Sequence, residues 1–157
     1  MKYLFKYNWE NRDQWFELCR PLSEEELLRN RAGGVGSILK TLFHIVDVEY
    51  SWIQGISNNP VTDPKFEDYM SVDLIHQLSN EYRPQIEQYL ANWKNDMEYV
   101  TVQVPWNDDS YFAGEVLRHV IMHEIHHIGQ LSIWARETGV QPISANFIER
   151  GFMKIGS

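Results

Sequence analysis

The chain has 157 residues, 43% of them hydrophobic and 13% aromatic, which is the composition of one globular domain over residues 1–157 and excludes a disordered chain. Its 22 acidic and 14 basic side chains give a formal net charge of −8, and no basic stripe is present to bind a nucleic-acid backbone. The single cysteine, Cys19, excludes an internal disulfide and is typical of a reducing compartment.

Neither a membrane span nor a signal peptide is visible in the sequence. The first residues turn charged early, and nowhere do about 18 apolar residues run together, as a membrane-spanning helix requires. We therefore expect a cytoplasmic protein without a nucleic-acid or membrane partner. We expect Cys19 to be a small apolar residue of the first helix, since no histidine is near it in sequence to make it a nucleophile.

The first part of the chain predicts two helices and a loop. An amphipathic helix over residues 6–20 ends at Pro21, and a short helix begins at the N-cap Ser23 and runs to about residue 30. The glycine cluster at residues 33–36 then breaks the chain. It lacks the Gly-Lys-Ser/Thr ending of a phosphate-binding loop and follows no strand, so we interpret it as a simple connection.

Three further long segments complete the prediction. Ser37 caps a helix that reaches about Ser57, and a second helix follows over residues 71–95, with Pro84 expected to bend it. Residues 99–104 alternate as in a short strand or extended loop, before a last long helix over residues 112–138. The sequence therefore predicts an all-α four-helix bundle with a short extended segment before the last long helix, and with functional residues facing inward.

The last long helix holds the most informative pattern, because four of the six histidines lie within residues 119–127. His123 and His127 are one turn apart and about 40° apart around the helix, on the arc that adjoins Val120 and Ile128. Both rings should therefore point inward, where polar rings without partners are costly. We interpret them as two ligands of one divalent metal ion; a pair that is only hydrogen-bonded is the alternative.

Two histidines hold a divalent ion weakly, so the site needs a third ligand. His44 lies on an amphipathic helix beside apolar residues, whereas His76 has polar neighbours. His119 continues the arc of His123 and His127, but three consecutive turns span about 11 to 12 Å, too far for one ion. We predict His44, His123 and His127 as the metal ligands and assign no catalytic or cofactor-binding residue.

The neighbouring polar residues have open roles. His126 lies about 60° to the other side of His123, so a contact with a ligand residue, a partner surface and plain solvent exposure all fit it. Gln130 could hydrogen-bond a metal-bound water, and either Asp47 or Glu49 could orient a ligand through its second ring nitrogen. Three tryptophans could line a pocket, pack in the core or lie at a subunit interface; they are Trp52, Trp106 and Trp134.

Two other metal sites share parts of this pattern. His123-Glu124-x-x-His127 matches the HExxH pattern of zinc proteases, but the third ligand lies far upstream and no substrate-binding edge strand is evident. A dinuclear carboxylate site would need a second Glu-x-x-His, which this chain lacks. Three histidines without a carboxylate favour a single Zn²⁺ or Ni²⁺ ion with open coordination positions.

The chain resembles the DinB family over nearly its whole length. Two segments carry the resemblance most specifically: residues 42–49 with Trp52 after them, and residues 119–130 with residues 136–139 after them. The resemblance implies a four-helix bundle with an up-down-down-up course, frequently a homodimer, and a divalent metal bound by three histidines. Carried onto this chain, these are His44, His123 and His127. Relatives include enzymes that use low-molecular-weight thiols such as mycothiol or bacillithiol in transferase or isomerase reactions.

The resemblance and the histidine pattern together suggest a divalent-metal-binding protein. The enzymatic hypothesis is a metal-dependent thiol S-transferase, or a related hydrolase or isomerase, that acts on a small molecule with a thiol such as bacillithiol. In this hypothesis the thiol would bind at an open position of the metal and attack an electrophile as a thiolate. The alternative is a non-enzymatic, metal-dependent binding or stress-response protein.

Overall fold

The computed structural model describes residues 1–152 and is mostly helical. Its helices are α1 (Lys2–Cys19), α2 (Glu24–Leu28), α3 (Ile38–Ile56), α4 (Val72–Asn92) and α5 (Ala113–Glu137), with short 3-10 helices η1 (Phe66–Asp68) and η2 (Asn95–Tyr99). Strands β1 (Thr101–Gln103) and β2 (Ser110–Phe112) form an antiparallel hairpin in which Val102 pairs with Tyr111.

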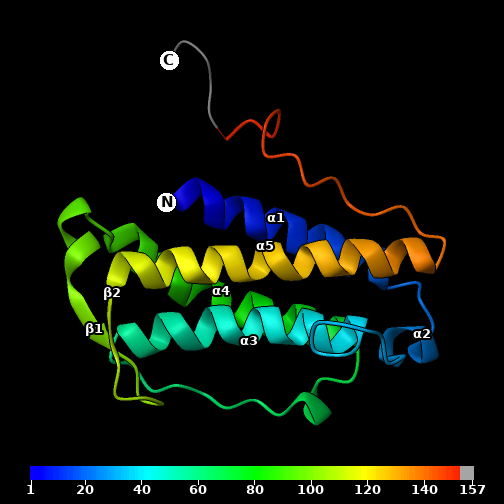
Figure 1. Ribbon diagram of the computed structural model, residues 1–157, viewed down its shortest axis with the longest axis horizontal. Helices are drawn as coiled ribbons and strands as arrows, with labels where there is room; N and C mark the ends of the chain where they lie inside the picture. The colour runs from blue at the N-terminus through cyan, green and yellow to red at the C-terminus, as the bar shows by residue number, and fades with distance from the viewer. Residues whose placement is uncertain (153–157) are drawn as a thin grey trace.

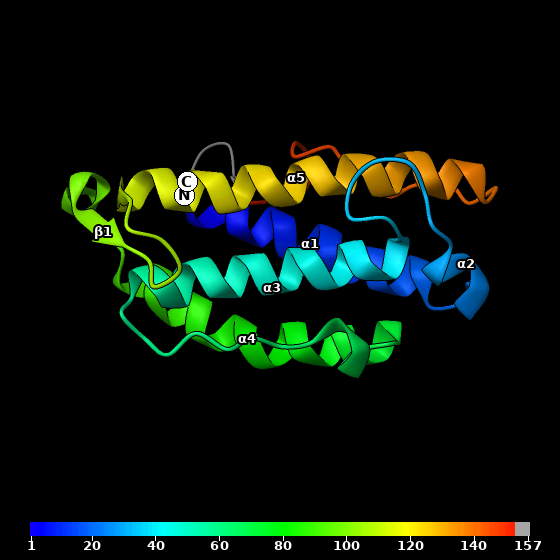
Figure 2. The same ribbon diagram turned by 60° about the horizontal axis from the view of Figure 1, so that its bottom comes forward.

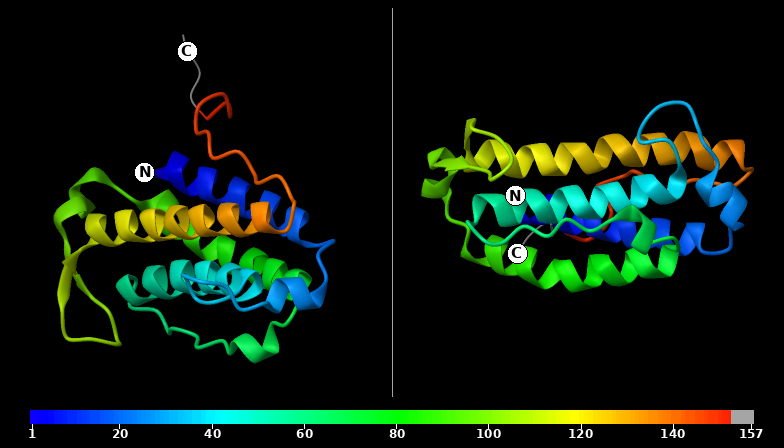
Figure 3. Two further views of the ribbon diagram at one scale, coloured as in Figure 1. Left: turned by 45° about the vertical axis from the view of Figure 1, so that its right-hand side comes forward. Right: turned by 90° about the horizontal axis from the view of Figure 1, so that it is seen from below.

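The four long helices form a bundle with the up-down-down-up course (Figure 1). α1 and α5 run in one direction along the bundle and α3 and α4 run in the other, so the connection between α3 and α4 travels back along the molecule (Figures 1 and 2). α3 lies between α4 and α5, as the right-hand view of Figure 3 shows, and α1 also packs against α4 and α5. The predicted all-α four-helix bundle is confirmed, and the hairpin is a minor addition.

Local sequence signals explain where three of the helices begin. The hydroxyls of Ser23, Ser37 and Ser71 each accept a hydrogen bond from the backbone amide three residues later, which begins α2, α3 and α4. α1 begins earlier than the predicted residue 6, because Phe5 is fully buried and its packing extends the helix toward the N-terminus. Pro84 lies inside α4 and does not end it.

The structure also bears on two expectations, one about Cys19 and one about membrane spans. Cys19 packs in the core, and burial raises the pKa of its thiol to about 12, so it is the inert apolar residue that the sequence predicts. Within residues 1–152, the helices all fall short of the length and apolar character that a membrane crossing requires.

The cap of α3 gives a first testable prediction, because this helix carries His44. Ser37 is buried, and its hydroxyl accepts from the amide of Lys40 at 3.2 Å. Ser37→Ala is expected to lower the free energy of unfolding by about 1 kcal/mol, since the amide of Lys40 loses its acceptor. Urea denaturation measures this loss. Ser37→Thr keeps an acceptor and should lose less; equal losses in the two variants would contradict the capping role.

Candidate metal centre

Three histidines from two helices converge between α3 and α5. The Nε2 atom of His123 lies 3.0 Å from Nε2 of His44 and 3.1 Å from Nε2 of His127. One ring nitrogen from each of the three lies within 4.8 Å of the other two. His127 is buried, whereas His44 and His123 are half-buried. The structure thus brings together the three residues predicted as ligands, in a cluster that could hold a metal ion.

Burial keeps the three rings uncharged. It lowers the pKa of His44 to about 4 and that of His123 to about 3, and repulsion between neighbouring histidines acts in the same direction. Burial lowers the pKa of His127 as well, against a hydrogen bond with Gln130 that raises it. At neutral pH the cluster therefore presents neutral imidazoles, which is the form that binds metals.

The donor set fits a divalent ion better than a closed hydrogen-bond network. A neutral imidazole has one N–H donor and one acceptor nitrogen, so three Nε2 atoms facing one another cannot all be satisfied mutually. Ligand nitrogens about 2.0 to 2.1 Å from a tetrahedral ion lie roughly 3.3 to 3.4 Å apart. The contacts of His123 with His44 and His127, at 3.0 and 3.1 Å, are close to this spacing.

Gln130 fixes the orientation of His127. Its Oε1 lies 2.7 Å from Nδ1 of His127, and its Nε2 lies 3.1 Å from Nε2 of the exposed His126. An amide oxygen can only accept, so Nδ1 of His127 is the protonated nitrogen and the lone pair of Nε2 faces the cluster. The structure thus assigns Gln130 to a ligand ring, where the sequence suggests a metal-bound water.

The two acids considered as partners of a ligand histidine bond elsewhere. Asp47 accepts a hydrogen bond from the hydroxyl of Ser51 at 3.3 Å. Glu49 is buried and accepts from Nε1 of Trp9 at 2.9 Å and from Arg12 at 2.7 Å. Of the open alternatives for orienting a ligand ring, the structure therefore favours Gln130, which bonds His127, over Asp47 and Glu49.

Glu124, the glutamate of the HExxH pattern, belongs to a buried ion network. Arg12 donates from Nε to Oε1 of Glu124 at 2.9 Å and from Nη1 to Oε2 of Glu49 at 2.7 Å, and Ser79 is 3.3 Å from the same Nη1. Burial disfavours the charge of Arg12, but the two carboxylates outweigh it and raise the pKa of the guanidinium. With its carboxylate committed to Arg12, Glu124 cannot serve as the water-activating base of a protease.

A group of aromatic rings packs around Trp52, next to the three-histidine cluster, and includes the ring of His119 from α5. The rings of Trp106, Tyr111 and His119 lie 5.1 to 5.6 Å from that of Trp52, all at steep angles. The ring of His119 is 6.0 Å from that of His123, and His119 lies outside the three-histidine cluster. Trp134, in contrast, is buried in the core.

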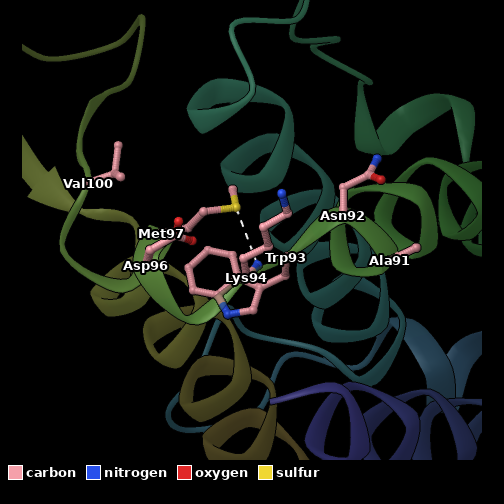
Figure 4. A pocket seen from close by; sticks show the side chains of 7 residues that line it. All are labelled: Ala91, Asn92, Trp93, Lys94, Asp96, Met97 and Val100. Carbon is pink, nitrogen blue, oxygen red and sulfur yellow. Dashed lines mark hydrogen bonds between the residues drawn. The ribbon is translucent and has the colours of Figure 1, made fainter.

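A cavity of about 560 Å³ lies away from the histidines, at the carboxyl end of α4 and along η2 (Figure 4). The amide of Lys94 there donates to the sulfur of Met97 at 3.4 Å. None of its lining residues belongs to the cluster; they are Ala91, Asn92, Trp93, Lys94, Asp96, Met97 and Val100.

Known proteins resemble the chain over almost its entire length. The sequence model of the DinB family matches residues 1–154. The uncharacterized protein YizA of Bacillus subtilis (strain 168) is 48% identical over 158 residues, covering 100% of this chain and 99% of that protein. The crystal structure of a DinB-like protein from Bacillus cereus ATCC 10987 is similar with a TM-score of 0.70, over 90% of this chain and 93% of that chain. At 18% identity, this last similarity shows a common fold.

Proposed function

The chain belongs to the DinB family, and from this premise we propose that it binds one divalent metal ion through Nε2 of His44, His123 and His127 and catalyses transfer to a small thiol. The observation that carries the proposal is the convergence of three uncharged imidazoles on one point between α3 and α5. The tautomer that Gln130 imposes on His127 supports it, because that tautomer leaves Nε2 free to bind.

The donor set favours Zn²⁺ or Ni²⁺. Imidazole nitrogen suits these borderline ions, whereas Mg²⁺ and Ca²⁺ prefer oxygen ligands. The acids nearest to the ligands in sequence bond elsewhere, since Glu124 binds Arg12 and Asp47 accepts a hydrogen bond from Ser51. Three protein ligands would suit a catalytic zinc site, which keeps a place for water or substrate, rather than a structural site with four protein ligands.

A divalent ion held by His44, His123 and His127 would lower the pKa of a thiol bound beside them, which would make the thiolate available at neutral pH. In the proposed reaction, the sulfur of a low-molecular-weight thiol such as bacillithiol forms a bond to an electrophilic carbon of a small substrate. The bond from this carbon to the leaving group breaks, the leaving group departs with the electron pair, and the thiol proton passes to solvent. Gln130 keeps His127 in its binding orientation throughout.

Elemental analysis tests the metal site. The purified protein is expected to carry about one divalent ion per chain, and His44→Ala and His127→Ala are each expected to lose most of it, because two remaining imidazoles bind weakly. His119→Ala is the matched control, since it removes a nearby exposed histidine outside the cluster. Undiminished metal in both ligand variants would refute the site.

Turnover tests the chemistry separately. Protein loaded with Zn²⁺ or Ni²⁺ is expected to accelerate the reaction of bacillithiol with a model electrophile, and His44→Ala is expected to lack this rate. If the wild-type protein retains metal but reacts no faster than His44→Ala, thiol transfer is wrong. The non-enzymatic alternative, a metal-dependent binding protein, would then account for the site.

A further inference from the structure

The glycine loop over residues 33–36, between α2 and α3, lies against the residue that orients His127. A Cβ atom placed on Gly34 would lie 2.6 Å from Oε1 of Gln130 and 3.1 Å from Cη2 of Trp134. Real Cβ atoms do not approach other atoms as closely as 2.6 Å, so a side chain at this position would force Gln130 to move. The absence of a side chain at Gly34 therefore matters for the neighbouring amide.

Gln130 has little freedom to move without losing its contacts. Its oxygen accepts from Nδ1 of His127 at 2.7 Å, and its amide nitrogen lies 3.1 Å from Nε2 of His126. If the amide of Gln130 moved away, Nδ1 of His127 would lose its hydrogen-bond acceptor. His127 would then lose its preference for the tautomer that leaves Nε2 unprotonated. The close approach of Gly34 is thus connected to the metal centre through one hydrogen bond.

We propose that Gly34 is a positioning residue of the metal centre: its lack of a side chain allows Gln130 to hold His127 with Nε2 free for a metal ion. The inference rests on the proposed metal site and extends it to a loop that, from sequence, has only a connecting role. Gly34 also has a positive φ of 55°, which alone favours glycine, so a test must separate backbone strain from the contact with Gln130.

Gly33 supplies the matched control. Its φ is 84°, and a Cβ atom placed on it meets no atom within 4 Å. Gly33→Ala and Gly34→Ala therefore both place alanine at a positive φ, and both should lower stability. Only Gly34→Ala should weaken metal binding, by about 10- to 100-fold, the usual effect of losing a residue that orients a ligand. Competition with a chromophoric chelator for Zn²⁺ measures the affinity.

A second measurement needs no metal. In the metal-free protein, the proton on Nδ1 of His127 should give a hydrogen-bonded imidazole resonance in ¹H–¹⁵N spectra. This resonance should persist in Gly33→Ala and be lost or shifted in Gly34→Ala. If the wild-type protein bound no metal, the proposed function would fail, yet this spectrum would still decide the role of Gly34. Equal spectra and equal affinities in the two variants would overturn the inference.

The route through Gln130 is tested by a double-mutant cycle. When Gln130→Ala already removes the amide, adding Gly34→Ala should cost little further metal affinity, because the methyl group then has room. Additive losses would overturn the route. If Gly34→Ala alone does not fold, recovery of folding in the double variant supports the contact. If Gly34→Ala and the double variant both fail to fold while Gly33→Ala folds, the contact with Gln130 is not the reason that position 34 requires glycine. The inference then fails.

Discussion

Arg12→Met is expected to lower the free energy of unfolding by about 3 to 5 kcal/mol, because two buried carboxylates would lose their cation. The side chains of Arg12, Glu49 and Glu124 are only 2 to 3% exposed. Burial raises the pKa of Glu124 against the attraction of Arg12, so without Arg12 this pKa would lie further above the unfolded value. The folded variant then binds more protons than the unfolded chain, so its stability should increase as the pH falls from 7 toward 5. Urea denaturation at several pH values measures both effects.

An exposed arginine provides the control for this prediction. Arg20 also bonds two acids, Glu17 and Asp73, but its side chain is 40% exposed. Arg20→Met should therefore lower the free energy of unfolding much less than Arg12→Met does, because solvent screens an exposed ion pair. If Arg12→Met costs as little as Arg20→Met, the buried network does not hold the bundle together.

The position of this network explains why its loss would matter for the site. Arg12 lies on α1, and its two acidic partners lie on α3 and α5, the helices that carry the three histidines. Glu124 is next to His123 in sequence and faces the core instead of the cluster. A single guanidinium thus joins the two ligand-bearing helices to the helix that covers them.

Helical geometry alone could have placed Glu124 correctly. Relative to His123, it lies about 100° around the helix, between Leu131 at about 80° and Leu117 at about 120°. Both leucines are fully buried, so Glu124 occupies the middle of the apolar face, where an acid needs a cation. The same geometry places His127 only about 40° from His123, which is why the ligand pair was predictable.

Other features depend on contacts that local sequence does not encode. The partner of Glu124 lies 112 residues away on α1, and no periodicity connects Arg12 to it. The loop over residues 33–36 was recognisable as a turn from its glycines, but its contact with Gln130 depends on its path in space. The four long helices were predictable, in contrast, because apolar periodicity acts within each segment, and serine caps also mark the starts of α3 and α4.

Binding of Zn²⁺ is expected to raise the free energy of unfolding by about 4 kcal/mol when the free ion is about 1,000 times its dissociation constant. The gain should vanish in His44→Ala. In the metal-free protein, the pKa of His44 is lowered to about 4 and that of His123 to about 3, so the unfolded chain binds more protons below about pH 6.5. Stability of the metal-free protein should therefore be highest above pH 6.5 and fall as the pH is lowered toward 4.

The gain from metal should depend on pH differently from the metal-free stability. Protons compete with the ion only where they bind the folded cluster, and burial lowers the pKa of all three ligands, so the gain should hold from pH 8 through pH 6.5 and decline as the pH falls toward 4. Denaturation with and without Zn²⁺ across this range separates the two curves. His119→Ala should keep the full gain. A gain that is already halved at pH 6.5 would mean that the histidines titrate as exposed rings do, and that burial does not hold the cluster ready for the ion.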